Sequence, residues 1–186
     1  MLTEDYLIRR INQVIALLLH AVGLRQNGQI QAALTDIDIA LELLVGMRSH
    51  LIKGMSDASI LEMLTVRGEL DMERLALVAD LFKEEGQLFQ AGNQPQAARQ
   101  DFTRALSFSL EVALADMASL RPEQIASIAE VAQWLNGQPL SMELRVSLYN
   151  YTQELLAKED SVLAAGGVSR AQLEAELAGL KSRLQL

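Results

Sequence analysis

A pattern of small residues occurs twice in this chain and limits its fold more than any other feature. In each copy a glycine is followed by alanines and large apolar residues at helical spacing, and the second copy has one more residue between its glycine and the first of these alanines. The two sets are Gly28, Ala33, Ile37, Ala40 and Leu41, and Gly92, Ala98, Phe102, Ala105 and Leu106. Antiparallel helices approach closely only where alanine or glycine removes side-chain bulk. The sequence therefore predicts a packed helical hairpin that is made twice.

The composition favours helices throughout. Leucine and alanine dominate, runs of β-branched residues are absent, and only Pro95, Pro122 and Pro139 interrupt the chain. A chain of 186 residues of which 50% are hydrophobic can bury a sizeable core. We predict an all-α protein with one helical domain over residues 1–120. A C-terminal helical extension over residues 121–186 then packs on this domain or serves dimerisation.

Charge and cysteine content exclude several classes of protein. The net charge is −8 and the pI about 4.8, whereas binding to nucleic-acid phosphates depends on lysine and arginine. The absence of cysteine excludes disulfides and is compatible with a reducing compartment. The chain starts with acidic rather than basic residues, and the apolar stretch from Val14 to Leu19 is too short to span a bilayer. We expect a soluble cytoplasmic protein that binds neither nucleic acid nor membrane.

Glycines, prolines and capping residues divide the chain into helices. A connector over residues 48–70 with one short helix separates the two hairpins, Gly166-Gly167 forms a hinge, and Ser169 with Gln172 forms a capping box for the last helix. The expected helices cover residues 3–27, 30–47, 59–66, 72–91, 95–120, 122–137 and 139–165, and a last helix after residue 169.

Both hairpins carry small and large residues at the spacings of a known repeat. The first has Ala21, Leu24, Gly28, Ala33, Ile37 and Ala40, and the second has Phe82, Gly86, Phe89, Ala98, Phe102 and Ala105. These positions resemble tetratricopeptide repeats, although Val45 and Leu110 replace the proline that ends each repeat. Asp5-Tyr6-Leu7-Ile8-Arg9 at the start is followed by the first glycine hairpin, then by Gly68-Glu-Leu-Asp71-Met-Glu-Arg74-Leu75 and Lys83-Glu-Glu-Gly86. This order over residues 1–115 is similar to an uncharacterised bacterial domain family with a tetratricopeptide-like fold. This resemblance implies a fold and no particular chemistry.

The resemblance also suggests which residues form a groove, because tetratricopeptide domains commonly bind peptides along the first helix of each hairpin. The corresponding residues are Ile15, Leu18, Val22 and Arg25 in the first hairpin, and Asp80, Lys83, Gln87 and Gln90 in the second. Three apolar groups in a row are costly to leave in water, so we expect another helix or a second copy of the chain to cover them. The polar second set lacks the several cations that grip a peptide carboxylate.

No pattern typical of catalysis or metal binding is found in the sequence. Neither His20 nor His50 has a carboxylate three or four residues away, so the Glu-x-x-His pair of helical metal sites is absent. We expect His20 to be partly buried with a backbone or carboxylate partner, and His50 to be solvated. Phosphate-binding loops and nucleophile arrangements are also missing. We therefore expect no enzyme, no metal and no cofactor.

The remaining charged and aromatic groups have ordinary structural interpretations. Acidic neighbours on a helix point in different directions and are expected to form solvated faces. An arginine near Tyr6 is expected to pair with an acid of a neighbouring helix, and the C-terminal aromatic residues are expected in the core. These groups are the pairs Asp36/Asp38 and Glu84/Glu85, the arginines Arg9 and Arg10, and the aromatic set Trp134, Tyr149 and Tyr151.

The sequence supports two hypotheses for function. The first is a non-enzymatic helical interaction or scaffold module that dimerises through the apolar face of residues 7–22 or through a leucine seam spaced like a coiled coil. That seam consists of Leu173, Leu177, Leu180 and Leu184. The alternative is a binding protein for a small apolar ligand or lipid tail between helices, suggested by seven methionines.

Overall fold

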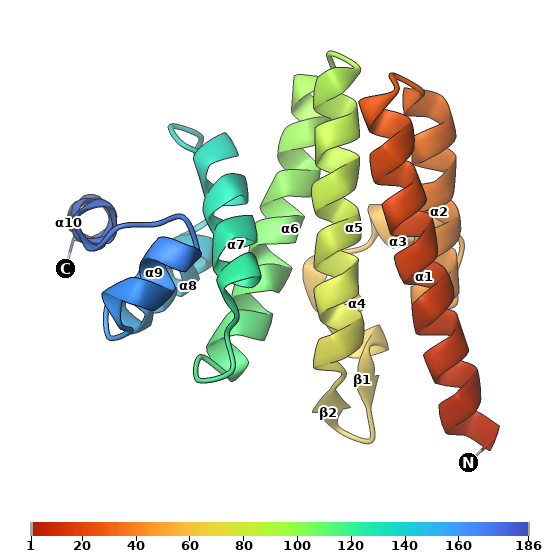
Figure 1. The fold of residues 1–186 in the computed structure, drawn as a ribbon, viewed down its shortest axis with the longest axis horizontal. Coiled ribbons are helices and arrows are strands. Elements are labelled where there is room, and N and C mark those ends of the chain that lie inside the picture. The colour runs from red at the N-terminus through yellow and green to blue at the C-terminus, as the bar shows by residue number, and fades with distance from the viewer. Residues whose placement is uncertain (1, 186) are drawn as a thin grey trace. The chain divides into compact units, whose positions relative to one another are not determined.

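The computed structural model describes residues 2–185, with side chains from residue 6 onward, and confirms the all-α class. These residues form ten helices and one small two-stranded sheet (Figure 1). The elements are α1 (Leu2–Gln26), α2 (Ile30–Val45), α3 (Ser49–Gly54), α4 (Asp57–Met63), β1 (Thr65–Val66), β2 (Glu69–Leu70), α5 (Met72–Ala91), α6 (Pro95–Ala115), α7 (Pro122–Trp134), α8 (Met142–Leu155), α9 (Asp160–Ala165) and α10 (Arg170–Leu184).

The chain divides into two compact units. Unit 1 is Met1–Ala105 and unit 2 is Leu106–Leu186, so the boundary lies inside α6 and before the position predicted at residue 120. The physical reason is the length of α6, which is buried on both sides of the boundary: Phe102 belongs to unit 1 and Phe108 to unit 2.

The turns of the two hairpins in unit 1 have the same hydrogen bonds. After α1, the Gln29 N–H donates to the Leu24 carbonyl at 2.9 Å, and Gly28 has a φ of 73°. After α5, the Gln94 N–H donates to the Phe89 carbonyl at 2.8 Å, and the residue with positive φ, at 56°, is Asn93. Both turns follow the glycine-type helix ending.

The equivalent of Gly28 is therefore Asn93 and not Gly92, which corrects the pairing predicted from the sequence. With Asn93 in this place the two copies align without a gap. The aligned pairs are Ala33 with Ala98, Ile37 with Phe102, Ala40 with Ala105, His20 with Glu85, and Asp36 with Asp101.

Small residues bring the paired helices together as predicted. Ala33 and Ile37 are fully buried where α2 packs antiparallel against α1 (Figure 1). In the second hairpin, a Cβ atom added to Gly86 would lie 2.8 Å from ring carbons of Phe102. This distance leaves no room for a side chain, so α5 and α6 approach closely because residue 86 is glycine.

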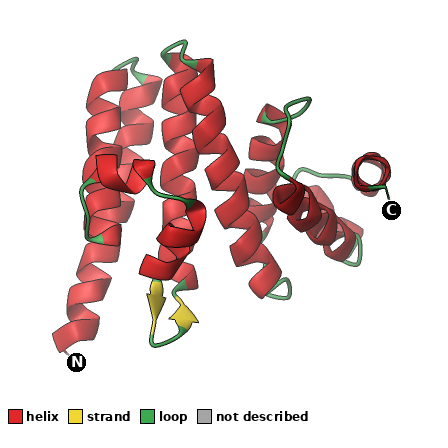
Figure 2. Cartoon of the chain, turned by 180° about the vertical axis from the view of Figure 1, so that it is seen from behind, coloured by secondary structure: helices red, strands yellow, loops and turns green. Residues whose placement is uncertain are grey.

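The connector between the hairpins has more structure than the predicted single helix. It contains α3, α4 and the hairpin of β1 and β2, which pair antiparallel with Val66 opposite Glu69 (Figure 2). The Ser56 side chain accepts a hydrogen bond from the Ser59 N–H, so α4 begins earlier than predicted. Arg67 and Gly68 both have positive φ, as a two-residue hairpin turn requires.

In unit 2 the predicted helix over residues 139–165 is two helices, α8 and α9. Arg170 explains the break, because its guanidinium donates to the carbonyls of Leu156 at 2.6 Å and Lys158 at 2.9 Å. These carbonyls lie just beyond the end of α8, where carbonyl groups lack partners within a helix, and Arg170 supplies the hydrogen bonds that a continued helix would have made. The predicted capping box of Ser169 and Gln172 is present at the start of α10.

Gly166 is a packing position as well as a break. A Cβ atom there would lie 2.6 Å from the Cγ2 atom of Ile125, which is fully buried on α7. We predict that Gly166→Ala lowers the free energy of unfolding by about 1–3 kcal/mol, because the added methyl group overpacks this contact. Urea denaturation measures this change.

The matched control for this substitution is Gly179→Ala. Gly179 lies inside α10 with nothing within 4 Å of an added Cβ atom, so alanine there is expected to raise the free energy of unfolding by about 0.5–1 kcal/mol. Equal effects of the two substitutions would contradict the packing role of Gly166.

Candidate functional site

The outer side of α1 carries an uncovered apolar stripe. Leu19 is 67% exposed, Ile8 is 56% exposed and Ile15 is 39% exposed, whereas Val14 and Ala21 on the inner side are fully buried. We define the outer stripe as the residues that lie on this side at helical spacing, namely Ile8, Asn12, Ile15, Ala16, Leu19 and Gly23; Asn12 is its one polar member, and Gly23 is partly buried. α1 thus has two apolar sides: the inner one is buried in a helix that packs against α2 and α5, and the outer one is exposed.

The structure separates the eight residues predicted to form an interaction surface. Ile15 is exposed, Leu18 and Val22 are partly buried, and Arg25 forms an ion pair with Glu84, with its Nε atom 2.6 Å from Oε1. Arg25 therefore holds α1 to α5 within unit 1. On α5, Asp80 is exposed, while Lys83, Gln87 and Gln90 are partly buried.

The apolar part of α1 extends well beyond the stretch from Val14 to Leu19. Tyr6–Gln26 is long and apolar enough to cross a membrane by length and composition, although core helices of soluble proteins and signal sequences meet the same criterion. Only 17% of its apolar window is buried in the structure. This low burial agrees with the exposure of the outer stripe.

Glu84 and Glu85 are buried, which corrects their prediction as a solvated face. Glu84 pairs with Arg25, and Glu85, which is fully buried, accepts a hydrogen bond from the Lys53 ammonium. The two side chains point in different directions, as neighbours on a helix do. α5 is covered on more than one side, so both side chains are buried: Glu84 faces Arg25 of α1, and Glu85 faces Lys53 of α3.

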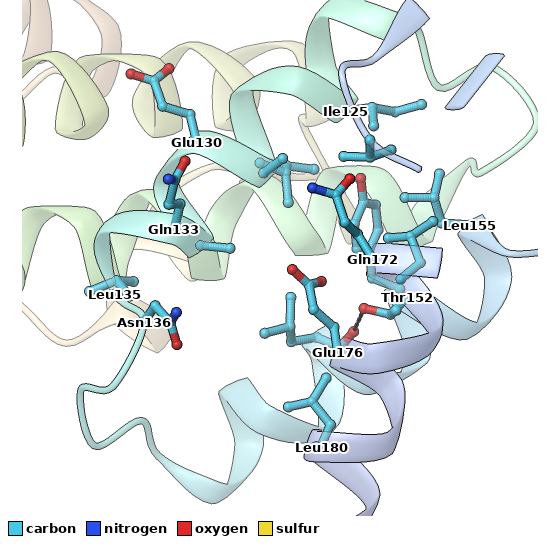
Figure 3. Close-up of a pocket in the computed structure, with 18 of the residues that line it drawn as sticks. Ile125, Glu130, Gln133, Leu135, Asn136, Thr152, Leu155, Gln172, Glu176 and Leu180 are labelled. Carbon is cyan, nitrogen blue, oxygen red and sulfur yellow. Dashed lines mark hydrogen bonds between the residues drawn. The ribbon is translucent and has the colours of Figure 1, made fainter. Parts of the chain in front are cut away.

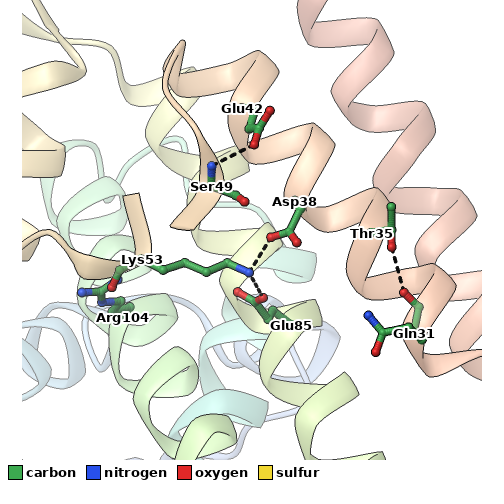
Figure 4. Close-up of polar contacts among 8 residues, drawn as sticks. All are labelled: Gln31, Thr35, Asp38, Glu42, Ser49, Lys53, Glu85 and Arg104. Atoms are coloured by element: carbon green, nitrogen blue, oxygen red, sulfur yellow. Dashed lines mark hydrogen bonds and ion pairs between the residues drawn. The ribbon is translucent and has the colours of Figure 1, made fainter. Parts of the chain in front are cut away.

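Two cations attach the connector to the helical hairpins (Figure 4). The Lys53 Nζ atom bridges Glu85 and Asp38, with 2.6 Å to the Asp38 carboxylate. Arg104 donates to the carbonyls of Lys53 at 2.9 Å and Met55 at 2.5 Å. These contacts fix α3 and the start of α4 against α2, α5 and α6.

Asp38, Lys53, Glu85, Arg104 and Asp101 form what we call the ion cluster of unit 1. Asp101 is its unusual member. It is 8% exposed, and its Oδ2 atom and the Oε2 atom of Glu85 are buried without a hydrogen-bond partner. Burial, and then the negative charge of Glu85, raise the pKa of Asp101 to about 8. Asp101 is therefore protonated at neutral pH, which avoids two adjacent buried charges.

The first hairpin has a solvated version of this pair. His20 and Asp36 occupy the positions equivalent to Glu85 and Asp101, and the His20 Nδ1 atom lies 2.6 Å from the Asp36 Oδ2 atom. The predicted carboxylate partner of His20 is confirmed. The His20 side chain, however, is 66% exposed and not partly buried as predicted. No group of three or more potential metal ligands occurs within the part of the chain that the structure describes.

Unit 2 contains a groove of about 700 Å³ between α7, α8 and α10 (Figure 3). Its walls include apolar side chains such as Ile128 and Leu155 and the polar side chains of Gln133 and Glu176. Glu176 is exposed as a whole, and the partial loss of water from its carboxyl group within the groove raises the pKa of that group. The sequence singled out Tyr151, Gln172, Leu173 and Leu180 for other roles, but not as walls of one groove, because only the tertiary fold brings the three helices together.

The predicted leucine seam faces the interior of unit 2. Leu173, Leu180 and Leu184 are buried, Leu177 is partly buried, and α10 packs against α8. The seam spacing is therefore satisfied within the chain, and these side chains are not available to a second copy. The prediction of a dimer seam at this helix is corrected accordingly.

The remaining aromatic and arginine predictions are met in part. Tyr151 is buried and Tyr149 partly buried, but Trp134 is 46% exposed. Arg10 donates to the Leu43 carbonyl and lies 5.5 Å from the centre of the Tyr6 ring, so the backbone of α2 supplies its partner.

Comparison of the chain with known protein families, with curated proteins and with solved structures found no match. The likeness to tetratricopeptide repeats stays a prediction, and any functional proposal rests on the geometry of the two units.

The protonation of Asp101 predicts a specific pH dependence of stability. The unfolded chain releases this proton near a pKa of 3.8, whereas the folded protein keeps it up to about pH 8. The stabilisation is therefore complete below the unfolded pKa and is lost as pH rises through the folded pKa. We predict that Asp101→Asn removes this loss and raises the free energy of unfolding at about pH 8.5 by about 1–3 kcal/mol.

Urea titrations across this pH range measure the effect. Glu111→Gln, at an exposed position of the same helix, is the control and is expected to leave the pH profile unchanged. A profile for Asp101→Asn that parallels that of the unaltered protein would refute the assignment of the proton to Asp101.

Proposed function

We propose that this protein is a non-enzymatic helical interaction module that self-associates through the outer stripe of α1. One observation carries the proposal: Ile8, Ile15 and Leu19 lie exposed on one side of a helix whose other side is already packed. Full burial of a single leucine or isoleucine contributes about 1.5–3 kcal/mol. A contact that covers these three side chains therefore supplies much of the free energy of a stable association.

Gly23 supports the contact independently. Glycine inside a helix costs about 0.5–1 kcal/mol relative to alanine. Nothing lies within 4 Å of an added Cβ atom at Gly23, so the packing of the chain itself does not require glycine there. The absence of a side chain beside Leu19 allows a second helix to approach closely.

A second copy of the chain is the partner that the charges favour. The outer stripe contains no charged side chain, so two copies with a net charge of −8 each can meet there without placing like charges in the contact. A two-fold axis would place the same stripe on both sides of the interface. A membrane surface is less well matched, because helices that bind membranes carry lysine and arginine on their polar side, and this chain is acidic.

The same proposal includes a tetratricopeptide-like relationship between the two hairpins. Their turns have the same hydrogen bonds, and their small and large residues align without a gap. Proteins built from such repeats commonly act as binding scaffolds, which agrees with an interaction role.

The first test is Leu19→Glu, analysed by size-exclusion chromatography with light scattering. We expect the unaltered protein to be a dimer and Leu19→Glu to be monomeric, because a charge placed in an apolar contact remains unpaired on burial. Leu51→Glu is the matched control, since Leu51 is 49% exposed on α3, away from the stripe.

The proposal fails if the unaltered protein is monomeric at all concentrations, or if Leu51→Glu dissociates it equally well. Co-sedimentation with vesicles, performed in parallel, distinguishes a membrane. Vesicle binding by a monomeric protein, abolished by Leu19→Glu, would assign the stripe to a lipid surface and overturn self-association.

The second test is Gly23→Ala, for which folding and association are expected to change in opposite directions. Alanine is expected to stabilise the monomer by about 0.5–1 kcal/mol while its methyl group weakens the dimer. Sedimentation equilibrium and thermal denaturation of the monomer measure the two effects. Gly179→Ala should give the same stabilisation without weakening the dimer, and a dimer unaffected by Gly23→Ala would argue against a close helix contact at this position.

A further inference from the structure

The groove of unit 2 has apolar walls. Polar groups without a hydrogen-bond partner lie at each of its two ends. Its volume of about 700 Å³ is typical of sites for small ligands, which occupy about 300–1,000 Å³. Neither the outer stripe nor the ion cluster of unit 1 involves these residues, so a ligand site here is independent of the proposed self-association.

One end of the groove favours a positively charged hydrogen-bond donor. Tyr151 is 4% exposed, and its hydroxyl group is buried without a hydrogen-bond partner. Glu176 extends from α10 into the same groove (Figure 3), and no ion pair or hydrogen bond of its carboxylate is found among the described residues. A carboxylate beside an unsatisfied hydroxyl can accept hydrogen bonds from an ammonium group.

The other end favours an anion. Arg183 lines the groove and also a smaller adjoining hollow of about 170 Å³, which Arg145 borders. The Arg145 Nε atom is buried without a partner, and its Nη1 atom makes only a long contact of 3.4 Å with the Arg183 carbonyl. Neither guanidinium forms an ion pair within residues 6–185, so both can bind a carboxylate.

The spacing of the two ends sets the length of the ligand. Glu176 and Arg183 lie two turns apart on α10, which corresponds to about 10 Å along the helix axis. An extended chain of three amino acids spans about 10 Å. Between the two charged ends, Leu180 of α10 and Leu135 beyond α7 present apolar surface to the ligand.

We propose that this groove binds a free peptide of about three apolar residues. Its amino group lies at Glu176 and Tyr151, and its carboxylate lies at Arg183 and Arg145. An apolar amine would leave the arginines without a partner, and a fatty acid would leave Glu176 without one. Only a ligand with charges of opposite sign at its two ends satisfies both.

The probe is trileucine, titrated into the full chain by isothermal calorimetry. Fluorescence of Trp134 gives a second readout, because it is the single tryptophan and lies next to Gln133 of the groove. We expect trileucine to bind, and N-acetylated and C-amidated trileucine each to bind at least about tenfold more weakly.

Two substitutions assign the ends of the ligand. Glu176→Gln should abolish the preference for a free amino group and keep that for a free carboxylate, and Arg183→Gln should do the reverse. Glu174→Gln, at an exposed position of the same helix outside the groove, should change neither preference. Such crossed losses would not arise from a merely structural role, and circular dichroism verifies that each variant is folded.

Three results would overturn the proposal. The first is no binding of trileucine, and the second is equal binding of the free and capped peptides. The third is that hexylamine or hexanoate binds as tightly as trileucine, which would make the groove a site for an amphiphile with a single charged end.

Discussion

The close approach of paired helices at small residues is the constraint that fixes unit 1. Ala21 and Ile37 are fully buried in the first hairpin, and at the equivalent positions of the second Gly86 lies against the ring of Phe102. Since both hairpins use equivalent positions for this packing, their inner sides are fixed. The difference lies on the remaining sides: α5 is covered by further elements, whereas α1 keeps an apolar side exposed, and this side supports our proposal of self-association.

The buried ion cluster gives unit 1 a defined arrangement at an energetic cost. Lys53 and Glu85 lose water on burial, and such a loss offsets much of the attraction between the charges. These charged groups contribute to the structure by fixing a position, because the hydrogen bonds of Lys53 and Arg104 hold the irregular connector in one place. The proton on Asp101 limits the cost, and the equivalent pair in the first hairpin, His20 and Asp36, avoids it by remaining near solvent.

The sequence predicted the parts of the fold that depend on local signals. Glycines, prolines and capping residues located both hairpins and the start of α10, because these residues act on the backbone beside them. Contacts between distant residues were not predictable in this way. Arg170, at the start of α10, binds the carbonyls that follow α8. The partner that Glu85 meets on burial comes from another helix, and the leucines of α10 pack on α8 instead of a second chain. The groove was missed for the same reason, whereas the apolar face of residues 7–22 was predicted, because it follows from the spacing of apolar residues within one helix.

Self-association through α1 is tested most sharply by amide hydrogen exchange of the unaltered protein at two concentrations, one well above and one well below the dissociation constant. We expect dilution to speed exchange across the part of α1 that carries the outer stripe, while exchange in α2, which the proposed contact leaves alone, stays constant. Exchange in α1 that does not depend on concentration, in a sample shown to be dimeric, would place the interface elsewhere and contradict the proposed contact.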